Sequence, residues 1–205
     1  MALVKYNNNS ISAVTATGLA TGSLVPIKTL TASSSATLSF VHGTDGVVLD
    51  STYPIYKFEF INIHAPSNTI DFQFNLSTDG GSNYNVTKTT TYFRAYHTEQ
   101  GASGFGYRTG EDLAQSTSYQ NIMVGLEAQS DNNGSGFMTL FNPSSTTFVK
   151  HFIATSSFIQ TSEVQQNSFM AGYGNTTSAV NAVRFQMSSG NIDAGKIKLY
   201  GIKDS

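Results

Sequence analysis

The sequence predicts an all-β protein, an antiparallel jelly-roll-like β-sandwich with an extended N-terminal arm. In the run Ile70–Ser77, apolar and polar side chains alternate strictly, which is typical of a strand with one buried face. Clusters of Gly, Asn, Asp and Ser separate such runs at short intervals, which favours antiparallel pairing. Two packed sheets would bury one face of each, and an up-and-down barrel is the alternative.

The stretch from Asn68 to His97 is the strongest β signal in the chain. After Ile70–Ser77 come the turn residues Ser77–Ser82, in which two glycines and an aspartate allow the chain to reverse. A second β-prone run, Tyr84–Tyr96, then returns. We therefore expect a β-hairpin in the middle of a sheet, acting as scaffold.

The other elements follow from the same patterns, for about nine to eleven strands in total. Tyr53–His64 carries apolar residues on both faces, which predicts a central strand. The Gly-rich segment Gln100–Gly110 is expected to be a loop, and Glu111–Gln120 a short helix. Phe137–Phe141 and Thr146–Gln160 should form a hairpin around residues 142–145. The remaining expected strands are Ile27–Ala32, Ala36–Val41, Ile122–Leu126, Phe169–Tyr173, Ala182–Met187 and Lys196–Ile202.

Residues 1–27 differ from the sandwich domain expected over residues 28–205. They show no sustained periodicity and cannot form a core of their own. We interpret them as an attachment arm ended by Pro26, whose scattered apolar residues dock on a neighbour; a floppy tail is the alternative. The candidate docking residues are Leu3, Val4, Tyr6, Ile11, Val14, Leu19, Leu24 and Val25.

Composition excludes several classes of function. Charged residues are 12% of the chain and the net charge is −2, so the sequence has no basic field for nucleic acid and no polybasic membrane signal. Ser, Thr and Asn together supply about a third of the residues, so polarity is carried by neutral groups. There is no cysteine, hence no disulfide, and neither a signal peptide nor an apolar run of membrane-spanning length is visible.

No catalytic or metal-binding constellation stands out, so we expect no enzyme activity and no cofactor. The histidines His42, His64, His97 and His151 are not at ligand spacing. Residues 131–136 are similar to a calcium loop, but Asn142 stands where an EF-hand would need Glu. Asp71 and Glu59, on strands expected to be neighbours, are the only carboxylates offered for polysaccharide cleavage.

Aromatic residues are the remaining candidates for a binding site. Most of the phenylalanines fall on alternating strand positions and are assigned to the core. The expected exposed aromatics are Tyr92, Tyr96, Phe105, Tyr107 and Tyr119. We interpret Phe105, Tyr107, Arg108 and Tyr119 as a subunit interface, with a glycan-binding receptor loop as the alternative.

Four stretches resemble short virion structural proteins of tailed bacteriophages, especially marine ones. They are the final run Met187–Ile202, which ends in Leu-Tyr-Gly-Ile, the Ala/Ser-rich opening Thr29–Phe40, the turn Ser77–Gly81, and Phe141–Ser145. The resemblance covers about residues 27 to 203 and implies a virion location without any catalytic motif.

The leading hypothesis is therefore a non-enzymatic virion protein, made in the host cytoplasm, that decorates the capsid or forms a capsid-bound fibre. The resemblance and the arm imply homo-oligomerisation, with a trimer among the symmetries considered, and contact with the major capsid protein or tail proteins. The alternative is a tail-fibre or receptor-binding module that recognises a host-surface glycan. Neither hypothesis involves nucleic acid or a membrane.

Overall fold

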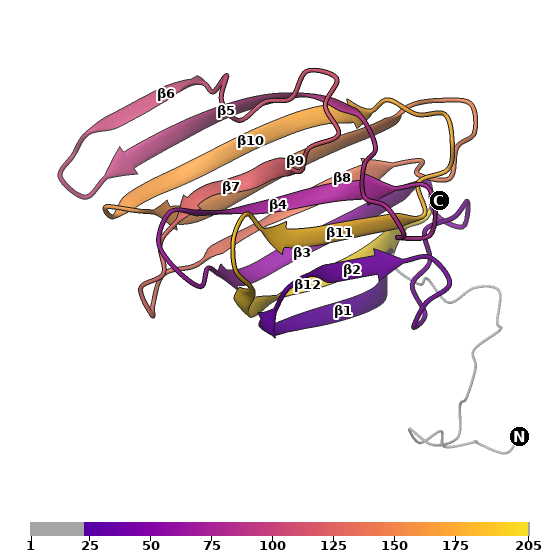
Figure 1. Ribbon diagram of the computed structural model, residues 1–205, viewed down its shortest axis with the longest axis horizontal. Helices are drawn as coiled ribbons and strands as arrows, with labels where there is room; N and C mark the ends of the chain where they lie inside the picture. The colour runs from indigo at the N-terminus through magenta and orange to yellow at the C-terminus, as the bar shows by residue number, and fades with distance from the viewer. Residues whose placement is uncertain (1–22, 205) are drawn as a thin grey trace, which may run out of the picture.

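In the computed structural model, which describes residues 23–204, twelve antiparallel strands form a β-sandwich (Figure 1). The all-β prediction and the two-layered sandwich are confirmed, whereas jelly-roll connectivity stays a prediction. The strands are β1 Leu24–Ser35, β2 Leu38–Val41, β3 Ile55–His64, β4 Ile70–Ser77, β5 Lys88–Thr98, β6 Ser103–Tyr107, β7 Gln120–Leu126, β8 Gly134–Phe141, β9 Lys150–Gln160, β10 Val164–Gly174, β11 Ala182–Met187 and β12 Ile192–Ile202.

A large sheet and a small sheet make up the two layers. The large sheet has the order β1-β12-β3-β8-β9-β10-β5-β6, from the bottom to the top of Figure 1. The small sheet, β2-β11-β4-β7, lies in front of it. The pairing of Leu126 in β7 with Gln160 in β9 joins the two sheets along one side. The small sheet therefore covers one face of the large sheet, and no strand among residues 23–204 covers the opposite face, which we call bare.

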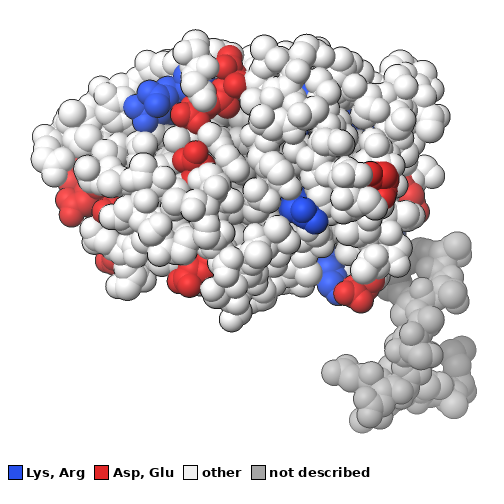
Figure 2. Space-filling model, viewed as in Figure 1, with Lys and Arg blue, Asp and Glu red and all other residues white. Residues whose placement is uncertain are grey.

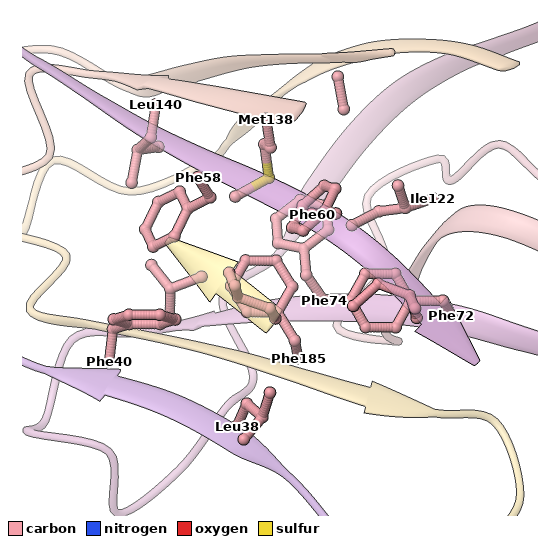
Figure 3. Close-up of a cluster of buried hydrophobic side chains, with 14 of the residues drawn as sticks. Leu38, Phe40, Phe58, Phe60, Phe72, Phe74, Ile122, Met138, Leu140 and Phe185 are labelled. Carbon is pink, nitrogen blue, oxygen red and sulfur yellow. The ribbon is translucent and has the colours of Figure 1, made fainter. Parts of the chain in front are cut away.

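Phenylalanine rings from both layers fill the core between the sheets (Figure 3). Phe185 of β11 lies at their centre, with ring centroids 5.3 Å from both Phe58 and Phe60 of β3. It also stacks nearly parallel to Phe72 of β4, at 5.8 Å. These rings are fully buried, so the alternation in β3 and β4 sets which face of each strand points inward.

The expected hairpin of Ile70–Ser77 with Tyr84–Tyr96 is wrong. β4 pairs with β7 and β11 in the small sheet, whereas β5 pairs with β10 and β6 in the large sheet. The turn at Ser77–Ser82 exists, and Ser77 Oγ donates to Asp79 Oδ1 at 2.6 Å. Beyond it the chain crosses from one layer to the other, because local turn residues reverse a chain without fixing its pairing partner.

Two further local assignments are wrong. The expected loop Gln100–Gly110 contains β6, which pairs with β5 from Phe93 to His97. The expected helix Glu111–Gln120 is irregular, because its backbone groups bond to β5: Thr90 N–H donates to Leu113 O at 2.9 Å. Edge pairing thus provides the hydrogen bonds that a helix would have made internally. The hairpin of β8 and β9 around residues 142–145, and the central position of β3, are confirmed.

Strand β1 begins earlier than the arm interpretation assumed. Leu24 and Val25, two of the candidate arm residues, lie in β1 and pair with Ile202 and Gly201 of the final strand. The other candidates, Leu3, Val4, Tyr6, Ile11, Val14 and Leu19, lie outside the described residues. Any attachment segment therefore ends before residue 24.

Candidate functional site

The bare face of the large sheet is the candidate functional site. Residues paired across antiparallel strands point to the same side, so the register groups the outward-facing residues of β6, β5, β10, β9 and β8. We call this surface the neutral face. Its residues are Ser103, Phe105, Tyr107, Thr89, Thr91, Phe93, Ala95, His97, Gln165, Asn167, Phe169, Ala171, Tyr173, His151, Ile153, Thr155, Ser157, Ile159, Ser135, Phe137, Thr139 and Phe141.

No Asp, Glu, Lys or Arg belongs to the neutral face as defined. Its polar groups are hydroxyls, side-chain amides and the imidazoles of His97 and His151. Charged side chains lie at its borders. On β3, Lys57 Nζ lies 2.9 Å from Glu59 Oε1 and 5.0 Å from the Phe137 ring centroid. At one end of the strands, the carboxylates of Glu99, Asp131 and Glu163 line a hollow together with His97, Ile159 and Gln165. On the opposite side of the molecule, Figure 2 shows acidic and basic side chains scattered over the surface.

An aromatic row crosses β6, β5 and β10 at one end of the neutral face. The rings of Phe93 and Phe169 stack with centroids 5.0 Å apart and an interplanar angle of 12°. Phe105 packs edge-on against Phe93 at 5.5 Å and is 73% exposed. Tyr107 is 52% exposed and donates its hydroxyl to Asp112 Oδ2 at 2.6 Å. Large apolar side chains exposed together are characteristic of interaction surfaces, whereas single ones are common anywhere.

The centre of the neutral face is also apolar. Ile153 is 48% exposed on β9, and Phe137 of β8 is 37% exposed. The small side chain of Ala171 leaves a shallow hollow bordered by His151, Ile153 and Tyr173. The rings of His151 and Tyr173 lie 5.9 Å apart beside this hollow. A flat surface with exposed rings beside amides and hydroxyls can bind another protein surface or a neutral polyol.

The four residues predicted as an interface or receptor loop are not brought together. Phe105 and Tyr107 lie on the neutral face, but in strand β6. Arg108 follows β6 and lies 4.0 Å from Glu111 Oε1. Tyr119 is half-buried and precedes β7 of the small sheet.

Sequence reasoning missed most of the neutral face and misassigned one tyrosine. Phe93, Phe137, Ile153, Phe169 and Tyr173 point outward. Alternation along β9 could have indicated that Ile153 points away from the core, because its neighbours Phe152 and Ala154 are buried. In this strand both faces carry apolar residues, however, and the sequence does not say which of the two faces another layer covers.

Tyr92, predicted as exposed, is fully buried within a polar cluster between the layers. Its hydroxyl lies 2.5 Å from Ser168 Oγ, and burial raises the pKa of Tyr92. Nearby, Arg94 donates to Gln166 Oε1 at 2.6 Å, and Thr90 donates to Gln120 Oε1 at 2.6 Å. Because these groups satisfy one another inside the sandwich, the cluster is part of the scaffold.

The carboxylates considered for catalysis do not form a pair. Asp71 lies on β4 of the small sheet and Glu59 on β3 of the large sheet, so the expectation of neighbouring strands is wrong. Burial raises the pKa of Asp71, whose Oδ1 accepts the Gly125 N–H at 2.8 Å. Within residues 23–204, no group of three or more His, Asp or Glu side chains is arranged to hold a metal ion. The same part of the chain contains no helix long and apolar enough to cross a membrane.

Comparisons with protein-family models, curated proteins and solved structures found no match to this chain. Function is therefore inferred from the neutral face, the fold and the sequence resemblance.

Proposed function

We propose that this chain is a non-enzymatic structural protein of a bacteriophage virion that self-associates through its neutral face. The observation that supports it best is the outer face of the large sheet, where Phe105, Tyr107, Ile153 and Phe137 are exposed and the outward-facing residues of β6, β5, β10, β9 and β8 include no Asp, Glu, Lys or Arg. The proposed virion location rests on the resemblance of Met187–Ile202 and the three other stretches to virion proteins. The protein acts by adhesion, as a capsid decoration or a capsid-bound fibre.

A second copy of this chain is the occupant that the chemistry of the neutral face favours. The cores of protein interfaces are depleted of charged residues and enriched in aromatic residues, and this face has both properties. Because its strands present no ionic side chain outward and the charged groups lie at its borders, two copies can meet through the centre of the same face with little like-charge repulsion. The contact is then isologous, and it generates a closed dimer or part of a larger symmetric oligomer such as a trimer of dimers.

Attachment to the particle is assigned to the segment before β1, with the major capsid protein or a tail protein as its partner. β1 is the edge strand of the large sheet farthest from β6, and Leu24 at its start is 43% exposed. The attachment segment and the neutral face would thus work from different parts of the large sheet. The protein is assigned to the virion after synthesis in the host cytoplasm.

Self-association is tested by light scattering and sedimentation of the purified full chain over a wide concentration range. We expect an oligomer that the double variant Phe105→Ser/Ile153→Ser converts to a monomer with an unchanged circular dichroism spectrum. Phe148→Ser is the matched control, because Phe148 is 70% exposed but lies in the loop before β9. A wild-type monomer at the highest concentration, or an oligomer equally sensitive to Phe148→Ser, would contradict the proposal.

A glycan-binding module is the second candidate, favoured by the hollow beside Ala171. An aromatic ring, Tyr173, an imidazole, His151, and the threonines Thr89 and Thr91 line this hollow. A ring that covers the apolar face of a sugar, with hydroxyl and imidazole groups for its hydroxyls, is a chemically suitable combination. Glycan-array binding that Tyr173→Ala removes, while the oligomer persists, would favour this candidate.

A further inference from the structure

The buried pair formed by Lys88 and Asn75 is the most unusual chemical feature of the interior. Both side chains are fully buried, and Lys88 Nζ lies 2.5 Å from Asn75 Oδ1. Within residues 23–204, the other hydrogen-bond acceptor of this amine is the carbonyl oxygen of Val86, at 2.8 Å. No carboxylate in residues 23–204 forms an ion pair with Lys88. A buried ammonium without a counter-charge is costly, so the amine is favoured in its neutral, nucleophilic form.

The carboxamide of Asn75 is held rigidly in front of this amine. Its Nδ2 donates to Tyr84 O at 2.6 Å and to Thr117 O at 3.0 Å. Its Oδ1 accepts the backbone N–H of Leu76 at 2.8 Å. This N–H is placed to stabilise negative charge that develops on Oδ1 when the adjacent carbon is attacked.

We propose that Lys88 and Asn75 form an intramolecular amide crosslink between their side chains. In this step the lone pair of the neutral Nζ attacks Cγ of Asn75, and the Nζ–Cγ bond forms. The Cγ–Nδ2 bond then breaks, a proton passes from Nζ to Nδ2, and one ammonia leaves. The products are a secondary amide and ammonia, and the step requires no oxidant or other reactant.

Two physical factors support the reaction in the folded chain. The fold holds the amine against the carboxamide, so their reaction is intramolecular. In well-oriented intramolecular reactions the effective molarity reaches about 10⁵–10⁸ M. Burial lowers the pKa of the Lys88 amine to about 7, so a large fraction is deprotonated above that pH. Because no acidic side chain contacts the pair within the described residues, we expect the crosslink to accumulate slowly after folding.

The crosslink would join the two layers of the sandwich. Asn75 belongs to β4 of the small sheet and Lys88 to β5 of the large sheet, with the crossing segment 78–87 between them. A covalent bond here would hold the layers together in a chain that has no cysteine. It would thus do for this sandwich what a disulfide does in other β proteins.

Mass spectrometry of the unmodified full chain tests the proposal without any variant. After incubation of the folded protein at pH 8, we expect the intact mass to be lower than the sequence mass by one ammonia. Trypsin should then cut after Lys57 and Arg94 but not after Lys88. Chymotrypsin should cut after Tyr84 and leave the flanking peptides joined. The full sequence mass after prolonged incubation would overturn the proposal.

Variants locate the ammonia loss. Lys88→Met should abolish it, whereas Lys150→Met should leave it unchanged. Lys150 is a matched control because it is also fully buried in the large sheet, but within residues 23–204 its amine donates to the carbonyl oxygens of Phe148 and Thr176, at 2.6 and 3.2 Å, and to no carboxamide. Ammonia loss that maps to the backbone at Asn133–Gly134, with free cleavage after Lys88, would also overturn the proposal. These results do not depend on the oligomeric state that tests the proposed function.

Discussion

At the scale of single residues, the turn after β4 shows how one carboxylate organises the backbone. Asp79 Oδ1 accepts the hydroxyl of Ser77 at 2.6 Å and the backbone N–H of Asn83 at 2.9 Å. The Asn83 side chain donates to Asp79 Oδ2 at 2.7 Å. These hydrogen bonds, chiefly that from Ser77, lower the pKa of Asp79 to about 2. Gly80 and Gly81 follow with φ of 71° and 84°, which completes the reversal.

We predict that Asp79 makes the folded protein sensitive to acid. Its pKa lies below the model-peptide value of 3.8, so the stabilisation is fully present above about pH 4 and is lost as pH falls through about 2. Urea denaturation of Asp79→Ala should therefore show a shallower loss of stability between pH 4 and pH 2 than the wild type. Parallel stability curves for the two proteins in this range would contradict the assignment.

At the scale of strands, the sequence pattern predicted most strand positions and the hairpin of β8 and β9, but not the pairings between segments farther apart in the chain. Period two places Tyr56, Phe58 and Phe60 on one face of β3, and all three are buried. The same period would place Ile63 on the opposite face with Ile55, yet Ile63 is fully buried because the register shifts at Asn62, whose φ is 53°. A bulge of this kind changes the phase of a strand and leaves almost no local signal. Whether β4 pairs with β5 or with another strand depends on how the apolar faces of all the strands pack together, and the local sequence does not contain that information.

Close approach of β8 and β9 at Gly136 gives a prediction at the same scale. A Cβ at this position would lie 2.3 Å from Thr155 O and 2.7 Å from Ser156 Cα, both backbone atoms of the paired strand. Gly136→Ala should lower the free energy of unfolding by about 1–3 kcal/mol, because the strands must move apart.

Gly106→Ala is the matched control for Gly136→Ala. Gly106 lies in β6, and a Cβ there would meet no atom within 4 Å. We expect its stability by chemical denaturation to be unchanged or slightly increased, since alanine restricts the unfolded chain. Equal losses in the two variants would show that the pairing of β8 with β9 tolerates a side chain at Gly136.

At the scale of the whole molecule, composition predicted a surface with few charges but not which face would have none. The low charge content is a property of the whole chain and does not distinguish one face from another. The layered arrangement decides the outcome, because the small sheet covers one side of the large sheet and leaves the central strands β9 and β10 bare on the other. Phe105 and Tyr107 could be recognised from sequence as exposed aromatics. Their continuity with Phe169 and Ile153 comes from pairing between distant segments, which no local pattern contains.

The whole molecule also sets where an attachment segment can be removed without harm to the sandwich. Ser23 O accepts the Lys203 N–H at 3.0 Å, and Leu24, Val25 and Pro26 are opposite the last residues of β12. We predict that a chain beginning at residue 23 keeps the wild-type thermal midpoint and oligomeric state. A chain beginning at residue 27 should lose about 1–3 kcal/mol of stability, because net contributions of about 1 kcal/mol per backbone hydrogen bond are removed from the edge of the large sheet.

Binding of the two truncated chains to virus particles from which the protein has been removed then separates attachment from folding. Loss of binding by the chain beginning at residue 23 is the expected result, and full binding by that chain would place attachment within the sandwich itself.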